Sequence, residues 1–234
     1  MPTKSSKIIV ALDFESSEKA ISFAESVSPG SCRLKIGKEL FTHAGPDLVR
    51  RIVDMGFDVF LDLKFHDIPN TVNKAVTAAC NLGVWMLNVH AMGGRTMMQA
   101  AKQAVESNRN KPKLIAVSIL TSTNQQGLNE LGIKKSVQQV VTDLTRMALE
   151  SGLDGMVCSA QEVSYLREQF GESPLLVTPG IRPAGADAND QQRIMTPEQA
   201  ILCGSSYLVI GRPITQHQNP LQELNRLNDS LMNL

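Results

Sequence analysis

The stretch Val59-Phe60-Leu61-Asp62-Leu63-Lys64-Phe65-His66-Asp67-Ile68-Pro69-Asn70-Thr71 joins a short apolar run to a group of charged residues. The run is almost continuously apolar, which is typical of a strand covered on both of its faces. If the strand alternates with period two, Asp62 and Lys64 lie on the same face. Charges that point into a fold are costly unless they are paired. The stretch therefore predicts a buried strand that ends in a set of paired charges.

Seven further apolar runs of this kind occur along the chain, with amphipathic stretches between them. The eight runs are Ile8–Leu12, Leu34–Ile36, Val59–Leu63, Met86–Val89, Leu114–Leu120, Met156–Cys158, Leu175–Val177 and Tyr207–Ile210. Residues 17–25 suit a helix, and residues 136–150 carry an apolar stripe at helical spacing. Thr196 and Pro197 match the preferences of the N-cap and first position of a helix.

The alternation of strands and helices indicates a parallel sheet. Eight units in 234 residues average about thirty residues each, the size of a β/α repeat. We therefore predict an α/β protein with a single (β/α)₈ TIM barrel, in which residues 1–234 form one domain. An open doubly wound sheet is the alternative. Against it, residues 10–14 lack the glycine-rich turn that follows the first strand of a dinucleotide-binding sheet.

The composition excludes several classes of protein. The 23 Lys and Arg residues balance 23 Asp and Glu residues, so no basic excess exists to neutralise a nucleic-acid backbone. No apolar stretch approaches the length of a membrane span, and the N-terminal run Ile8–Leu12 is too short for the apolar region of a signal peptide. Four separated cysteines without a C-x-x-C pair predict free thiols in a reducing compartment. We expect a cytoplasmic protein with no nucleic-acid or membrane partner.

The functional groups of a β/α barrel lie at the carboxyl ends of its strands. The polar residues at the predicted ends are Asp13, Lys35, Asp62, Lys64, His90, Thr121, Ser159, Thr178, Gly211 and Arg212. Lys35 lies on the strand next to Asp62 and Lys64, and Asp67 follows just beyond them. Two lysines and two aspartates could thus alternate in one array. Such an array is either a functional site or a buried salt-bridge cluster that only stabilises the fold.

The loops after the seventh and eighth strands are the usual phosphate site of such barrels. Thr178-Pro179-Gly180-Ile181-Arg182 closes the seventh strand, and Gly211-Arg212 closes the eighth. Glycine allows close approach of the backbone and arginine supplies a forked cation, although Gly-Arg-Pro alone could be a plain turn. Residues 182–193 form either a disordered surface loop or a mobile lid, from which Gln191 could reach a phosphate.

A metal site is the main competing hypothesis. The sequence contains no H-E-x-x-H motif, and its four histidines include no pair with ligand spacing on one helix. His90 could ligate a metal beside Asp62, although a histidine at such a position is more often only hydrogen-bonded. Lys35 and Lys64 occupy the place that a cation would need, which disfavours a divalent metal centre.

The pattern Asp62-x-Lys64-x-x-Asp67-Ile68-Pro69-x-Thr71 resembles the signature of the orotidine 5′-phosphate decarboxylase family. Further motifs follow in the order of that family: Ala11-Leu12-Asp13, Arg33-Leu34-Lys35-Ile36-Gly37, Leu120-Thr121, Thr178-Pro179-Gly180-Ile181-Arg182 and Ile210-Gly211-Arg212. The resemblance covers about the entire chain and is close to the bacterial form. It implies a (β/α)₈ barrel, a homodimer with shared active sites, and conversion of orotidine 5′-monophosphate to UMP and CO₂. It also implies that no cofactor and no metal take part.

The resemblance further implies a role for each matching residue. Lys64 would protonate C6 of the pyrimidine, Asp62 would face the substrate carboxylate, and Asp67 and Thr71 would come from the other subunit. The other expected contacts are Lys35 with Asp62 and the ribose, Asp13 with the ribose hydroxyls, Thr121 with the pyrimidine, and Arg182, Gln191, Gly211 and Arg212 with the phosphate. Asn88, His90 and Ser118 are expected near the mouth of the barrel without an assigned role.

Two other functions stay open. A magnesium-dependent sugar-phosphate decarboxylase or aldolase of the same barrel group shares Asp-x-Lys-x-x-Asp, although the continuation Ile68-Pro69-Asn70-Thr71 argues against it. A non-catalytic nucleotide-phosphate-binding protein would need Gly211 and Arg212 but would have no use for Lys64 beside two carboxylates.

Overall fold

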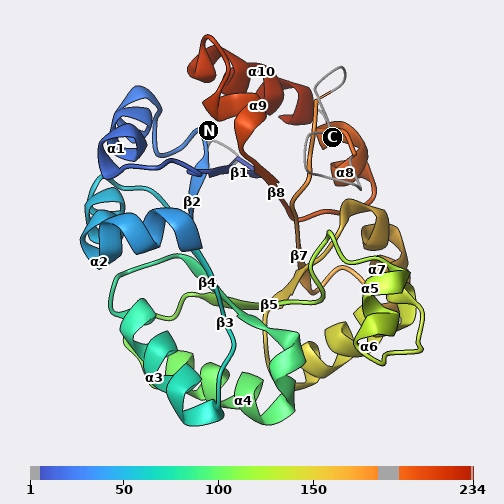
Figure 1. Cartoon of the computed structure of the whole chain (residues 1–234). Helices are drawn as coiled ribbons and strands as arrows, with labels where there is room; N and C mark the ends of the chain where they lie inside the picture. The colour runs from blue at the N-terminus through green and yellow to red at the C-terminus, as the bar shows by residue number, and fades with distance from the viewer. Residues whose placement is uncertain (1–5, 184–194, 233) are drawn as a thin grey trace.

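Eight parallel strands close into a barrel in chain order in the computed structural model, which describes residues 6–183, 195–232 and 234. Figure 1 looks along the barrel, with the helices arranged around the strands. The strands are β1 (Ile8–Ala11), β2 (Arg33–Gly37), β3 (Val59–Phe65), β4 (Met86–His90), β5 (Lys113–Val117), β6 (Gly155–Val157), β7 (Leu175–Thr178) and β8 (Tyr207–Ile210). Because β8 pairs with β1, the predicted TIM barrel is confirmed and the open sheet is excluded.

Helices connect the strands on the outside of the barrel. They are α1 (Ser17–Ser26), α2 (Lys38–Asp54), α3 (Pro69–Cys80), α4 (Gly94–Glu106), α5 (Gln125–Glu130), α6 (Val137–Glu150), α7 (Val163–Phe170), α8 (Pro197–Leu202), α9 (Arg212–Thr215) and α10 (Pro220–Met232), with short 3₁₀ turns η1 (Ala91–Gly93) and η2 (Ala160–Glu162). The predicted start at Thr196 is confirmed, since its side chain caps α8 in a capping box with Gln199. None of the described helices is long and apolar enough to cross a membrane.

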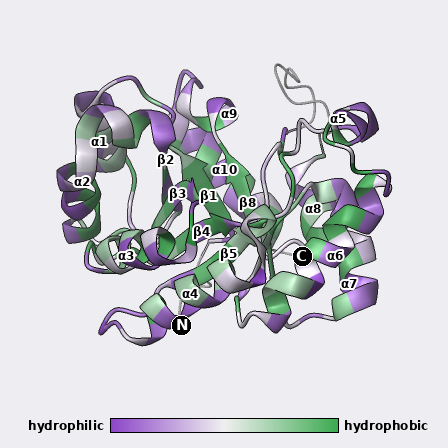
Figure 2. Ribbon diagram, turned by 60° about the horizontal axis from the view of Figure 1, so that its bottom comes forward, coloured by the Kyte–Doolittle hydropathy of each residue, from purple (hydrophilic) through white to green (hydrophobic). Residues whose placement is uncertain are grey.

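Two apolar layers explain why the strands are apolar almost throughout. Outward side chains such as Ile8 and Val10 belong to the large core between the strands and the helices. Inward side chains such as Ile9, Phe60 and Met86 form a separate, smaller cluster inside the barrel. Figure 2 shows the strands largely in the colour of hydrophobic residues, surrounded by helices that carry both colours. Burial of both faces removes the apolar–polar alternation that a half-exposed strand would show.

The inward faces become polar toward the carboxyl ends of the strands. Two residues beyond Phe60 on the same face of β3 lies Asp62, and two beyond Met86 on β4 lies Asn88, because successive side chains of a strand alternate. On β1 the same count leads from Ile9 to Ala11, which is still apolar, and the polar Asp13 follows two residues later. An apolar plug therefore fills the middle of the barrel, and polar groups lie at its carboxyl end.

Strand β3 becomes irregular where the charged residues begin. Its ladder with β4 pairs Leu61 with Leu87 and then Phe65 with Val89, so four residues of β3 oppose two of β4. Lys64 has φ 52°, and it is the only residue other than glycine with positive φ in the described part of the chain. Lys64 does lie beside Asp62, as expected, with Nζ 2.7 Å from Oδ1, but regular alternation does not place it there. A bulge sets the direction of the lysine instead.

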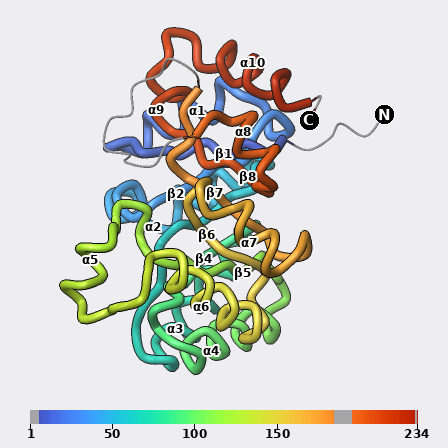
Figure 3. The backbone as a smooth tube through the Cα atoms, turned by 90° about the vertical axis from the view of Figure 1, so that its right-hand side faces the viewer, coloured from blue at the N-terminus to red at the C-terminus, as the bar shows by residue number. Residues whose placement is uncertain are grey.

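The loop after β7 is described only at its two ends. The backbone N–H of Arg182 donates to the carbonyl of Met195 at 3.0 Å, and Ile181 and Met195 form a bridge. Gln191 and most of the expected lid, residues 184–194, lie outside the described residues. Figure 3 shows α5 and α9 at the same end of the barrel, where the strands have their carboxyl ends.

The four cysteines are free thiols, as the sequence predicts. Cys32, Cys80 and Cys158 are buried. Burial raises the pKa of Cys32 to about 12 and that of Cys80 to about 11. These two thiols therefore stay protonated and pack as small apolar groups.

Candidate active site

A pocket of about 250 Å³ opens at the carboxyl ends of the strands. The predicted site residues that line it are Asp13, Lys35, Asp62, Lys64, Thr121, Arg182, Gly211 and Arg212. The apolar plug forms its floor through Ala11, Phe60, Val157 and Val209. The barrel thus brings together residues that are spread over two hundred positions of the chain.

Four charged side chains alternate in sign along one wall of the pocket: Asp13 just after β1, Lys35 on β2, and Asp62 and Lys64 on β3. Lys35 Nζ lies 3.1 Å from Asp13 Oδ1 and 3.6 Å from Asp62 Oδ2. Lys64 Nζ lies 2.7 Å from Asp62 Oδ1. Each lysine is thus paired, and Asp62 is shared between both ammonium groups. Within this chain Asp13, rather than Asp67, is the fourth member of the array.

Burial differs along the array. The side chains of Lys35 and Asp62 are 10% and 13% exposed, whereas that of Asp13 is 59% exposed. Lys64 lies between these values at 27%. The Lys35–Asp62 pair is the buried part of the array. The more exposed Lys64 ammonium and Asp13 carboxylate can contact a ligand.

Asn88 supports this array by two hydrogen bonds, a role that the sequence analysis did not assign to it. It is fully buried on β4. Its amide nitrogen donates to Asp62 Oδ1 at 2.7 Å, and its amide oxygen accepts the backbone N–H of Lys64 at 2.7 Å. A lone asparagine within the apolar run Met86-Leu87-Asn88-Val89 is the only sequence signal for it. Ser118, equally buried, donates to the carbonyl of Val157 and does not line the pocket.

Gly37 leaves the space that Lys35 occupies. A Cβ at this position would lie 2.9 Å from Lys35 Nζ. The backbone of Gly37 is extended, with φ −91° and ψ −178°, so the glycine is needed for space and not for its backbone conformation.

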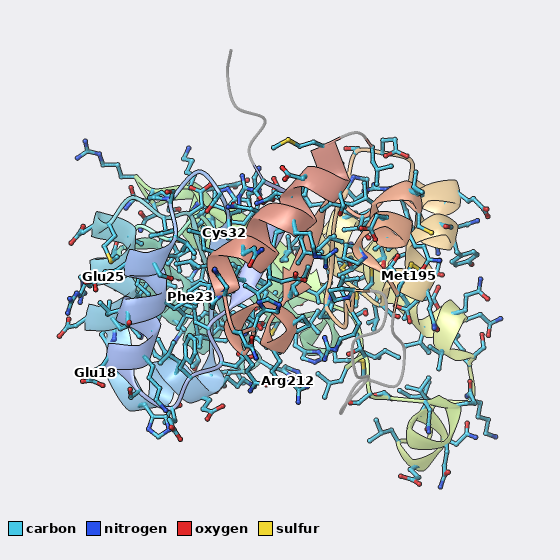
Figure 4. All side chains as sticks on the ribbon, turned by 90° about the horizontal axis from the view of Figure 1, so that it is seen from above. Glu18, Phe23, Glu25, Cys32, Met195 and Arg212 are labelled. Atoms are coloured by element: carbon cyan, nitrogen blue, oxygen red, sulfur yellow. The ribbon has the colours of Figure 1, made fainter. Side chains whose placement is uncertain are left out.

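Two arginines, from the segments that follow β7 and β8, also line the pocket. Arg182 is buried and donates to the carbonyl of Ile181, and Arg212 begins α9. Burial lowers the pKa of Arg182, and the nearby positive charge of Arg212 lowers it further. Figure 4 labels Arg212 near the lower edge of the molecule in that view. Two guanidinium groups close enough to repel each other form a place where an anion such as a phosphate is stabilised.

Asp67 and Thr71 lie outside the pocket. Both are exposed on the segment that leads from β3 into α3, and the Asp67 carboxylate accepts the backbone N–H of Ile68 at 2.6 Å. Ile68 is 66% exposed. His66, at the start of this segment, stacks on His90 of β4 with ring centroids 5.3 Å apart. The site-bearing loop thus presents two polar side chains and a large apolar one to the outside.

His90 has no metal partner set in this part of the barrel. No three His, Cys, Asp or Glu residues come together as metal ligands among residues 6–183 and 195–232. Burial lowers the pKa of His90, and the positive charges of His66, Lys38 and Lys64 lower it further. Its buried Nδ1 has no hydrogen-bond partner. The imidazole therefore packs against His66 as a neutral ring and does not line the pocket.

Comparison with protein families finds one match over nearly the whole chain. Residues 6–227 match the model of the orotidine 5′-phosphate decarboxylase / HUMPS family. A protein from Pseudoalteromonas translucida named orotidine 5′-phosphate decarboxylase is 58% identical over 229 residues, which cover 97% of this chain and 98% of that protein. One of the same name from Aliivibrio fischeri is 55% identical, with the same coverage of both chains.

Solved structures share the fold. The crystal structure of orotidine 5′-phosphate decarboxylase from Lactobacillus acidophilus has a TM-score of 0.86 at 36% identity, and the match covers 97% of this chain and 99% of that one. An uncharacterized conserved protein from Geobacillus kaustophilus has a TM-score of 0.83 at 39% identity, over 95% of this chain and 99% of that chain.

Proposed function

Because this chain belongs to the orotidine 5′-phosphate decarboxylase / HUMPS family, we propose that it converts orotidine 5′-monophosphate to UMP and CO₂, a step of pyrimidine biosynthesis. It is a carboxy-lyase. The observation that carries the proposal is the alternating array Asp13–Lys35–Asp62–Lys64 in a pocket that also holds two arginines. A protein that only bound a nucleotide phosphate would gain nothing from such an array.

The pocket accommodates the two ends of a nucleotide in different places. The phosphate binds Arg182 and Arg212, and the missing side chain of Gly211 allows it to approach the backbone. The ribose hydroxyls bind Asp13 and Lys35, and Thr121 contacts the pyrimidine. Gln191 is proposed as a further phosphate ligand on the strength of the family pattern alone.

The chemical step needs a group that stabilises negative charge on carbon. Loss of CO₂ leaves an electron pair on C6 of the pyrimidine, with no adjacent carbonyl to take it up. The Lys64 ammonium stabilises this charge and then donates its proton to C6, and the new C–H bond completes UMP. Asp62 and Lys35 keep Lys64 oriented, and we propose that neither a cofactor nor a metal takes part.

Repulsion between Asp62 and the carboxylate of the substrate explains only a small part of the proposed rate acceleration. Two like charges about 4 Å apart cost about 4 kcal/mol at an effective dielectric constant near 20. An enzyme of this kind lowers the barrier by about 20 kcal/mol. Most of the effect therefore arises in the transition state, where binding of the remote phosphate contributes.

A homodimer completes the site in this proposal. Asp67 and Thr71 lie too far outward to line the pocket of their own chain, and the exposed Ile68 beside them suits an interface with a second copy. Each chain, acting as one catalytic domain, would lend these residues to its partner. The four free thiols agree with a reducing, cytoplasmic location.

The decisive experiment adds orotidine 5′-monophosphate to the purified protein and follows its ultraviolet absorbance. Conversion to UMP at an unchanged rate in excess EDTA is expected. Absence of conversion would refute the proposed reaction. A rate that is lost in EDTA and restored by magnesium would instead favour the metal-dependent sugar-phosphate enzymes of the same barrel group.

A further inference from the structure

Asn88 contacts both members of the charged pair that the proposed reaction uses. Its amide nitrogen donates to Asp62 Oδ1, and its amide oxygen accepts the backbone N–H of Lys64, each at 2.7 Å. A carboxylate can only accept and a backbone N–H can only donate, so these two contacts define which way the amide points. Asn88 is fully buried and does not line the pocket. It therefore acts on a substrate only through Asp62 and Lys64.

The first contact orients the Asp62 carboxylate. Oδ1 receives both Lys64 Nζ and the Asn88 amide, while Oδ2 faces Lys35 Nζ at 3.6 Å. Without Asn88 the carboxylate would be held only by two flexible lysine side chains. Asn88 is the one rigidly placed donor among these three, because its own strand is buried in the barrel.

The second contact stabilises the backbone from which the lysine projects. The ladder between β3 and β4 shifts at this point, and Lys64 adopts φ 52°. A non-glycine residue in this region is strained and persists only where its surroundings hold it. The Asn88 amide oxygen stabilises this conformation, since it accepts a hydrogen bond from the backbone N–H of Lys64 itself.

We propose that Asn88 is a positioning residue for the decarboxylation, because one amide fixes both the Asp62 carboxylate and the left-handed backbone of Lys64. The inference rests on the proposed function. It assigns Asn88 no contact with the substrate. Its loss should therefore lower kcat and leave binding of the nucleotide nearly unchanged.

The test compares Asn88→Ala and Asn88→Asp with wild type and with Thr145→Ala. Thr145 is a suitable control because it is fully buried in α6 and its hydroxyl donates only to the carbonyl of Val141. Misplacement of a reacting group by about 1 Å can cost about a hundredfold in rate, so we expect a kcat loss of that order for Asn88→Ala. KM and the affinity for UMP should stay within about threefold, because they depend on the arginines and the ribose contacts.

The Asn88→Asp variant has a distinct dependence on pH. When the introduced carboxyl group is protonated it would keep both contacts, since its O–H donates to Asp62 and its other oxygen accepts from Lys64. Two adjacent carboxylates raise the pKa of one of them. Asn88→Asp should therefore regain activity at acid pH relative to wild type and lose it as pH rises. Thr145→Ala should follow the wild-type profile.

Hydrogen exchange of the Lys64 amide, measured without substrate, provides a readout that does not depend on the reaction. Protection should fall in Asn88→Ala and persist in Thr145→Ala.

The inference is overturned if Asn88→Ala keeps kcat and Lys64 protection, or if kcat and KM worsen only in step with a lower melting temperature. If Asn88→Ala does not fold, the pH profile of Asn88→Asp decides. Inactivity of wild type would refute the proposed function, while Lys64 protection would still decide the role of Asn88.

Discussion

Lys64 combines strain, pairing and partial exposure in a single residue. Its backbone is left-handed, its ammonium contacts Asp62 at 2.7 Å, and its side chain is 27% exposed. A purely structural salt bridge would need neither the unusual backbone nor access to a pocket. The strain is consistent with a conformation that is maintained for a task.

Replacement of Lys64 tests its proposed role in the decarboxylation directly. Lys64→Ala should lose at least about three orders of magnitude in turnover, because it removes the charge that stabilises the carbanion and the proton that replaces CO₂. UMP should still bind, since the arginines are untouched. Steady-state rates and calorimetric binding measure the two effects. Lys102→Ala, which removes a lysine paired only with Glu106, should behave as wild type. Near-normal turnover of Lys64→Ala would refute its role.

Gly37 makes a second prediction at this scale. In Gly37→Ala the new methyl group would lie 2.9 Å from Lys35 Nζ and displace it from Asp13 and Asp62. We expect kcat/KM to fall about tenfold or more, with little change in melting temperature, because the displaced atom is the end of a flexible side chain. Gly30→Ala is the matched control, since nothing lies within 4 Å of its new Cβ. Equal kcat/KM in both variants would contradict the crowding argument.

At the scale of elements, β3 and β4 cooperate to build the site. The bulge in β3 turns Lys64, and β4 supplies both the amide that holds it and the ring of His90 behind the next loop. Neighbouring barrel strands thus provide the Asp62–Lys64 ion pair and its support. Lys64 thus lies on β3, whereas the side chain that positions it, Asn88, lies on β4.

His90 predicts how this region responds to acid. Its pKa in the folded protein lies below the ordinary value near 6.5, through burial and the charges of His66, Lys38 and Lys64. Below about pH 6.5 the unfolded chain binds this proton before the folded one, so the free energy of unfolding falls as pH decreases. Above that pH the group contributes no slope. His90→Gln should flatten the acid side of the stability profile in urea unfolding experiments. A steeper slope for His90→Gln than for wild type would contradict the lowered pKa.

At the scale of the whole molecule, closure of the barrel decides which residues meet. β1 and β8 pair, so Asp13 and Gly211 reach the same pocket from opposite ends of the chain. Asp67 and Thr71 remain on the outside of the same chain. In the proposed function, these two residues act in a site shared between the subunits of a dimer.

Mixed dimers test that arrangement. Lys64→Ala and Asp67→Ala should each be nearly inactive alone. When the two proteins are unfolded and refolded together, about half of the dimers are hybrids, and each hybrid has one intact site and one doubly altered site. About a quarter of wild-type activity should therefore return, measured by the absorbance assay. Activity that stays at the level of the separate variants would exclude a shared site.

Much of the architecture follows from local pattern. Each of the eight apolar runs coincides with a barrel strand, although the fifth run, Leu114–Leu120, extends past the end of β5 at Val117. The helix start at Thr196 and the gathering of Asp13, Lys35 and Asp62 at one end of the barrel are also read correctly, because burial and capping depend on near neighbours in the chain. The positive φ of Lys64 and the part played by Asn88 are not, since they arise where β3 slips against β4. That slip depends on how two strands 24 residues apart pair, and no periodicity within either strand encodes it. Local chemistry therefore determined which groups the site contains, and packing between strands decided which of them touch.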